Sequence, residues 1–247
     1  NSPEYVHTVS SALDLAMADR ERFYGDPRFV DVANGLWTKE YAAMRRSLIS
    51  SDKAFREMPP PGDPMSLQAV WAKPTPSHPP GVITSAGQEP TDTTYVCVAD
   101  AEGNLFSMTP SDGGFGSPMV PGYGIILGGR MTQFRLTPGH SAALKPGKRP
   151  TITPAPALVL KDGRPFMALG TPGEDQQTQS MLQTFLNVAD FHMNVQEAIE
   201  APKFGSSNYP GWFAPHTYHP GRLCIERRLA DEVGDRMRKK GRDVMEW

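Results

Sequence analysis

The feature that most constrains this fold is a proline-rich stretch between a helical region and a region of short strands. Residues 58–81 hold eight prolines in 24 positions, within PPPGDP and KPTPSHPP, and no hydrophobic period continues through them. Such a segment is expected to be extended or irregular rather than packed. We therefore expect helices before it and mainly strands directly after it.

The N-terminal region has the pattern of amphipathic helices. Ser2 and Pro3 fit the N-cap and first position of a helix that ends near Gly25, and a second helix is predicted over 38–49, capped by Thr38. The apolar positions of the first helix share one face: Val6, Val9, Leu13 and Met17.

The C-terminal two thirds begin with strand patterns and continue with helices. A buried strand over 93–99 is predicted to form a hairpin with 105–109 across the turn sequence DAEGN. A short strand is expected over 124–127, and two more around Asp162-Gly163. Helical stripes follow, the last one carried by Leu229, Val233 and Met237. Strands followed by helices predict a layered α+β sandwich.

Composition excludes several classes of function. A net charge of −2 and a pI near 6.3 give no basic surface for nucleic acid, and no apolar run reaches the 18 residues of a membrane span. Cys97 and Cys224 are expected to be buried apolar residues rather than a disulfide framework. His216 and His219, three apart between prolines, favour a loop over a metal site.

Thr93 raises a chemical question, because it begins a predicted strand directly after the proline-rich stretch. Threonine is common in strands, so an ordinary strand start is one interpretation. The other is that cleavage before Thr93 frees its α-amino group, which then serves as the base for its own hydroxyl. The residues alone leave both interpretations open.

A resemblance bears on that choice. TTYVCVADAEGN, from Thr93, resembles the start of the small subunit of γ-glutamyltranspeptidases, which are N-terminal nucleophile hydrolases. Four further motifs resemble that family in the same order: AMADRERFYGDPRFVDV, GKRPTITPAPALVLKDG, GTPGED and NVQEAIEAPKF. The resemblance implies a four-layer αββα sandwich. It also implies a large-subunit part at 1–57, a linker at 58–92 that ends at the self-cleaved bond, and a small catalytic subunit at 93–247.

The family resemblance also implies roles for individual residues. Thr93 would cleave the Asp92–Thr93 bond and then attack the substrate amide, and Ser111 would stand where the family has a second threonine. The backbone N–H groups of Gly173 and Glu174 would form the oxyanion hole, although Glu174 adds bulk and charge where the family has glycine. No cofactor or metal is implied, and the two subunits of one precursor would associate as a heterodimer that acts on a small-molecule amide.

Several positions depart from the family's substrate pocket. Gln133 replaces the aspartate that holds the substrate α-ammonium, and Arg130 stands at a glutamine position. Gly113 replaces an asparagine, and Ile152 and Thr153 replace two serines that bind the substrate carboxylate. Because an ammonium without its carboxylate is strongly disfavoured, we expect an acyl group that bears a carboxylate but is not strictly γ-glutamyl, with Arg130 as its partner.

An alternative remains: an unprocessed, non-catalytic relative that acts as a binding or scaffold protein. The family's large subunit is much longer than the 92 residues before Thr93, so we expect this sequence to be part of a longer chain. Periplasmic, secreted and cytoplasmic locations all remain open.

Overall fold

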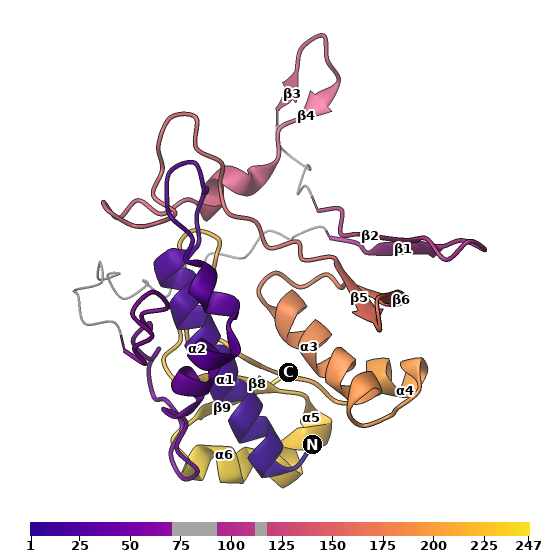
Figure 1. The fold of residues 1–247 in the computed structure, drawn as a ribbon. Coiled ribbons are helices and arrows are strands. Elements are labelled where there is room, and N and C mark those ends of the chain that lie inside the picture. Colours follow the sequence, from indigo (N-terminus) through magenta and orange to yellow (C-terminus); the bar gives the residue numbers. More distant parts are fainter. Residues whose placement is uncertain (71–92, 112–117) are drawn as a thin grey trace. The chain divides into compact units, whose positions relative to one another are not determined.

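The computed structural model describes residues 1–70, 93–111 and 118–247 (Figure 1). The chain divides by its internal contacts into two units. Unit 1 comprises 1–84, 133–151 and 202–247, and unit 2 comprises 85–132 and 152–201. Most of the predicted linker, from 71 to 92, lies outside the described residues. Helices and small sheets occur in both units, so the expected α+β class is confirmed.

Unit 1 is built from helices and one three-stranded sheet. The strand order is β7-β8-β9, with β7 antiparallel and β9 parallel to β8. Its regular elements are α1 (Pro3–Phe23), the 3-10 turn η1 (Asn34–Trp37), α2 (Lys39–Arg46), β7 (Phe204–Ser206), β8 (Arg222–Ile225), α5 (Arg227–Leu229), the π-helical turn η3 (Ala230–Gly234), α6 (Asp235–Lys239) and β9 (Asp243–Glu246).

The core of unit 1 lies where α1 meets this sheet and the C-terminal helical segment. Val6 of α1 is fully buried beside Phe204 of β7, and the ring of Tyr5 meets the Phe204 ring edge-on at 5.9 Å. The other buried members of the core cluster are Leu223, Ile225, Leu229, Ala230, Val233 and Met237.

The predicted helices of unit 1 are confirmed with changes at their ends. The Ser2 hydroxyl caps α1 by accepting from the Tyr5 amide at 3.2 Å, and the helix ends at Phe23. The second helix is shorter than the predicted 38–49, although Thr38 does cap it by accepting from the Tyr41 amide. The last predicted helix is interrupted by the π-helical turn η3.

The described residues of unit 2 form three hairpins and two helices. The hairpins are β1-β2, β3-β4 and β5-β6, all antiparallel, and β2 lies against both β5 and β6. The elements are β1 (Val96–Ala99), β2 (Leu105–Met108), β3 (Met119–Val120), β4 (Ile125–Ile126), β5 (Ala157–Lys161), β6 (Arg164–Leu169), α3 (Gln176–Ala189) and α4 (Val195–Glu200); the 3-10 turn η2 (Gly129–Gln133) spans the unit boundary.

The turn chemistry of these hairpins follows the sequence. Gly103 has a φ of +88°, and Asp162 and Gly163 have φ of +52° and +75°. A two-residue hairpin turn of this kind requires a positive φ at both of its central residues, and glycine and aspartate tolerate positive φ well. The predicted hairpins are therefore confirmed.

The predicted start of the first strand, its burial and the burial of Cys97 are all wrong. The strand begins at Val96 rather than at Thr93, and all four residues of β1 are exposed. Cys97 is exposed with them, whereas Cys224 in β8 of unit 1 is buried as expected. The reason is that β1 pairs only with β2 in a two-stranded sheet, and the side chains of β1 contact solvent on both faces of the strand.

Candidate functional site

Thr93 lies opposite Ser111 because of the register of the first hairpin. The antiparallel pairing of β1 and β2, continued three residues back from Val96, places position 93 across from position 111. The Thr94 amide supports this by donating to the Pro110 carbonyl at 3.0 Å. The hydroxyl oxygens of Thr93 and Ser111 are 2.9 Å apart, which is a hydrogen bond. Strand pairing alone thus brings the two predicted hydroxyl groups together.

Arg130, from the 3-10 turn η2, lies on the other side of Ser111. Its Nη2 donates to the Ser111 hydroxyl at 2.6 Å and also to the Ser111 carbonyl, while Nη1 reaches the Thr153 hydroxyl at 3.4 Å. A guanidinium donates hydrogen bonds and accepts none, so Ser111 Oγ is an acceptor toward Arg130. The structure therefore joins four predicted residues: Thr93, Ser111, Arg130 and Thr153.

Gly173 and Glu174, the predicted oxyanion-hole residues, form the turn that precedes α3. Both have positive φ, +118° and +49°. The left-handed conformation is uncommon for a residue other than glycine, and such outliers occur often at functional sites. No hydrogen bond among the described residues joins Thr93 to this turn, so its part in the site stays a prediction.

Tyr95 is a neighbour of the site that the sequence prediction missed. Its ring lies against Gly170, in the space that a Cβ atom there would occupy, and its hydroxyl is 2.9 Å from the Ser107 hydroxyl. The contact brings the strand that follows Thr93 against the start of the GTPGED loop. Alternation along a strand places Thr93 and Tyr95 on one face, and this signal was present in the sequence.

Among the other predicted residues, the side chain of Gln133 makes no hydrogen bond to this cluster. Gln133 is fully buried, and both polar atoms of its amide lack a hydrogen-bond partner among the described residues. It belongs to unit 1, whereas Thr93 and Arg130 belong to unit 2. Gly113 lies outside the described residues, and Ile152 is exposed.

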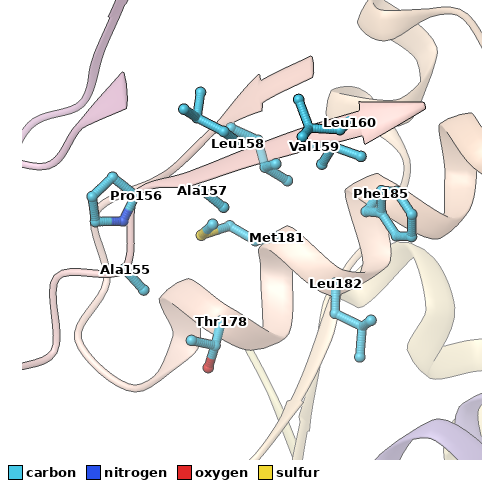
Figure 2. Close-up of a pocket in the computed structure, with 11 residues that line it drawn as sticks. Ala155, Pro156, Ala157, Leu158, Val159, Leu160, Thr178, Met181, Leu182 and Phe185 are labelled. Atoms are coloured by element: carbon cyan, nitrogen blue, oxygen red, sulfur yellow. The ribbon is translucent and has the colours of Figure 1, made fainter. Parts of the chain in front are cut away.

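Unit 2 also contains an apolar cavity of about 590 Å³ between β5 and α3 (Figure 2). Side chains of both elements line it, including Ala157 and Val159 of β5 and Met181 and Phe185 of α3. Thr178 supplies the one hydroxyl in this lining. Such a lining offers packing surface rather than groups for catalysis.

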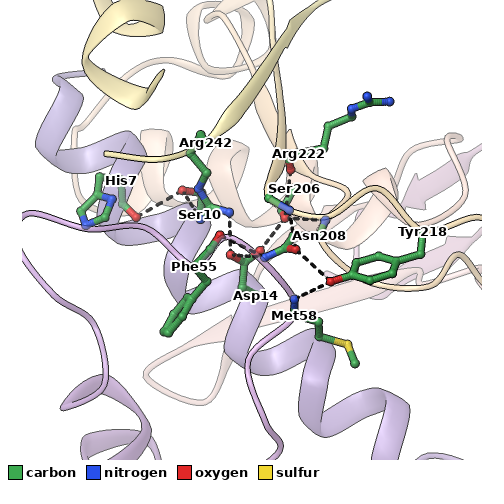
Figure 3. Close-up of polar contacts among 11 residues, drawn as sticks. His7, Ser10, Asp14, Phe55, Met58, Ser206, Asn208, Tyr218, Arg222 and Arg242 are labelled. Atoms are coloured by element: carbon green, nitrogen blue, oxygen red, sulfur yellow. Dashed lines mark hydrogen bonds and ion pairs between the residues drawn. The ribbon is translucent and has the colours of Figure 1, made fainter. Parts of the chain in front are cut away.

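A polar cluster in unit 1 is structural. Figure 3 shows Asp14 of α1 at its centre, where the carboxylate accepts from Arg242 at 2.6 Å, from Ser206 at 2.5 Å and from Asn208 at 3.2 Å. The side chains of Asp14 and Arg242 are fully buried. Desolvation raises the pKa of Asp14, and the Arg242 charge opposes that rise. These bonds tie the helix to β7, to the segment that follows β7 and to the segment that follows α6.

No metal site is found among the described residues, which contain no cluster of three or more His, Cys, Asp or Glu side chains. The two ring nitrogens of His216 lie 3.0 and 3.1 Å from the carbonyls of Gly211 and Phe134. These contacts join the loop of His216 to the segment that contains Phe134. In the part of the chain that is described, none of the helices combines the length and apolar character needed to cross a bilayer.

Comparison with known proteins places the chain in a family. The family model described as γ-glutamyltranspeptidase matches residues 1–247. The Acylase ACY 1 proenzyme of Pseudomonas sp. (strain SE83) is 38% identical over 99% of this chain, and the Glutathione hydrolase proenzyme of Bacillus subtilis (strain 168) is 32% identical over 88%. The chain spans 38% and 36% of these two relatives.

A solved structure of a mutant Helicobacter pylori γ-glutamyltranspeptidase is also similar. It superimposes with a TM-score of 0.51 at 31% identity, covering 62% of this chain and 84% of that one. The sequence motifs, the family model that matches all of this chain and the structural similarity all indicate the same family. The chain belongs to the γ-glutamyltranspeptidase family of N-terminal nucleophile hydrolases.

Proposed function

We propose that Thr93 is the nucleophile of an amide hydrolase or acyltransferase, set free by self-cleavage of the Asp92–Thr93 bond. The observation that carries this proposal is the 2.9 Å contact between the hydroxyls of Thr93 and Ser111, with Arg130 bonded to Ser111 from the other side. A threonine hydroxyl needs a base beside it. The α-amino group of a terminal Thr93 would be that base.

The reaction would run through two acyl transfers. The Thr93 amine takes the proton from its own hydroxyl while Oγ1 attacks the substrate carbonyl, and the N–H groups of Gly173 and Glu174 stabilise the oxyanion. The amine leaving group departs with the proton, which leaves an ester on Thr93. Water or a second amine then attacks the ester and restores the hydroxyl.

Arg130 and Ser111 would set the direction of the hydrogen bonds. Because Arg130 can only donate, Ser111 Oγ accepts from it and keeps its own proton available for donation to Thr93 Oγ1, which is the direction we propose. The Thr93 proton is then directed away from Ser111 and toward the α-amino group. A donor on Oγ1 also stabilises the negative charge that develops there during attack.

The acyl group would bear a carboxylate without being strictly γ-glutamyl. Arg130 supplies a cation bonded to Thr153 and Ser111, and the motif resemblance implies that both of these residues stand near the substrate. At position 133 a neutral amide replaces the carboxylate that would pair with an α-ammonium. The relatives' names, an acylase and a glutathione hydrolase, support a choice among amides rather than a different reaction.

The proposal includes the subunit boundaries 1–57, 58–92 and 93–247, a heterodimer of the two products, and the four-layer sandwich. The structure of the Helicobacter pylori relative covers 62% of this chain, close to the share that 93–247 contributes, 155 of 247 residues. Both relatives named above are proenzymes, which supports processing of a precursor.

Intact-mass measurement on the whole protein that carries this chain tests the proposal. We expect two fragments separated at Asp92–Thr93, and one unprocessed species for Thr93→Ala, with Thr93→Ser as the control that still cleaves. A wild-type protein that stays uncut would instead favour a scaffold role.

For the substrate, we expect faster release of p-nitroaniline from a glutaryl than from a γ-glutamyl anilide, and equal rates would contradict the substrate assignment.

A further inference from the structure

A second cavity, wholly within unit 1, has the chemistry of a ligand site. It measures about 550 Å³ and combines cationic, hydroxyl and aromatic groups. Lys145, Lys148 and Arg22 are its cationic side chains, and Phe23 and Phe29 supply aromatic surface. None of these residues belongs to the cluster around Thr93.

Lys148 is a buried cation in this cavity without a carboxylate in contact. Its exposed fraction is 8%, and its Nζ donates to the neutral carbonyl of Ser141 at 2.5 Å and lies 5.8 Å from the Phe29 ring centre. Asp26 exerts an attraction but is bonded to Arg28 and Arg149 instead. Desolvation lowers the pKa of Lys148, with a further contribution from Lys145. Burying an ammonium in this way is costly unless an anion joins it.

Ser141 adds a second observation that points to a ligand. Its exposed fraction is 7%, and its hydroxyl has no hydrogen-bond partner among the described residues. A buried hydroxyl left without a partner costs roughly 1–3 kcal/mol. Ser141 and Lys148 line the same cavity, so one carboxylate could accept from the hydroxyl and pair with the ammonium.

The rest of the lining limits the class of ligand. The apolar wall, formed by Phe23, Phe29 and Val30 among others, suits an aromatic or branched aliphatic body. Asp31 and Asp63 also line the cavity, and they disfavour a ligand with several negative charges.

We propose that this cavity binds a small monocarboxylate with an apolar body, its carboxylate held by Lys148 and Ser141. The inference is independent of the proposed acyl transfer, because it uses no residue of that site.

Phenylacetate is the probe, titrated by calorimetry into the whole protein and soaked into its crystals. We expect saturable binding of one molecule per chain, in the cavity, and none of phenethylamine, which has a similar body but the opposite charge. Lys148→Met should weaken binding about tenfold or more, since it removes a charge-assisted bond. Ser141→Ala should weaken it about fivefold, since it removes one neutral bond.

Lys161→Met is the matched control. Its Nζ lies 5.7 Å from the Phe166 ring, much as Lys148 lies near Phe29, but Lys161 is exposed in β5 and does not line the cavity. It should bind phenylacetate as the wild type does. A thermal melt shows whether Lys148→Met folds. If it does not, phenylacetate binding by Lys148→Arg, which keeps the cation, and by Ser141→Ala tests the inference instead. No saturable binding, equal binding of phenethylamine, or unchanged binding in Ser141→Ala would overturn the inference.

Discussion

Unit 1 and unit 2 differ in what their sheets bury. In unit 1, Phe204, Leu223 and Ile225 are fully buried against a helix that the same unit supplies. In unit 2, Val98 is 56% exposed and Leu160 is 62% exposed, although both lie in strands. An isolated two-stranded hairpin is marginally stable in water. The unit that carries Thr93 therefore has apolar sheet surface still to be covered, as the proposed four-layer sandwich would cover it.

The largest expected effect is the loss of Arg242 in the buried cluster of unit 1. Arg242→Met leaves the Asp14 carboxylate buried without its cation, which typically costs about 3–5 kcal/mol. The free energy of unfolding in urea measures it. The matched control is Arg222→Met, whose pair with Asp243 is partly exposed at 2.9 Å and should contribute about 1 kcal/mol or less.

The same variant has a pH signature. Desolvation already raises the pKa of Asp14, and removing Arg242 raises it further. When an acid has a higher pKa in the folded than in the unfolded state, the protein loses stability as the pH rises through the folded-state pKa of that acid. Arg242→Met should therefore be less destabilised at pH 4 than at pH 7, and Asp14→Asn with Arg242→Met should recover stability at pH 7. A penalty independent of pH would mean that lost packing, rather than the charge, is the cause.

The second prediction compares equal truncations in the two units. Leu223→Ala in β8 removes a fully buried side chain and should cost about 2–5 kcal/mol. Leu160→Ala in β5 removes an exposed one, so its effect should stay within about 0.5 kcal/mol. Urea unfolding of this chain measures both. If Leu160→Ala also destabilises the chain strongly, the faces of unit 2 are covered and the contrast between the units fails.

Repeating Leu160→Ala in the longer protein sharpens the comparison. If the proposed second sheet covers β5 there, the same substitution should become destabilising in that protein. An unchanged small effect would count against the sandwich around this strand.

The sequence predicted what local rules determine. The face of α1 follows from its period and the turn at Asp162-Gly163 from its backbone preference. The pairing of Ser111 with Thr93 was implied by the family resemblance, and the hairpin register of the structure brings the two hydroxyls together. The sequence prediction failed where burial depends on what covers a strand. Val98 and Cys97 are residue types that are usually buried, yet both are exposed. The strand pattern specifies apolar side chains but not the layer that covers them.

Contacts distant in the sequence were also not predictable from composition. Arg130 was assigned to the substrate, and its bonds to Ser111 and Thr153 arise from the placement of η2, which no periodicity encodes. The sequence analysis did not identify the Lys148 cavity, because a lysine in a KRP motif is usually expected to be an exposed charge. Only the fold shows that its ammonium is buried.

The last prediction, with a smaller expected effect than the losses of Arg242 and Leu223, tests whether packing in unit 2 supports the site. The Gly170 α-carbon lies against the Tyr95 ring, so Gly170→Ala must displace that ring at a cost of about 1–3 kcal/mol. Because Tyr95 follows Thr93 by two residues, kcat of the processed protein should fall as well. Gly128→Ala is the control, since a Cβ there meets no atom within 4 Å.

A double-mutant cycle separates the two causes of a Gly170→Ala defect. If the ring clash is responsible, Tyr95→Ala combined with Gly170→Ala should be less destabilised than the sum of the single variants, because the clash is then absent. Additive losses would assign the defect to the loop itself. In that case the loop, rather than Tyr95, would carry the connection between the strand after Thr93 and the turn at Gly173.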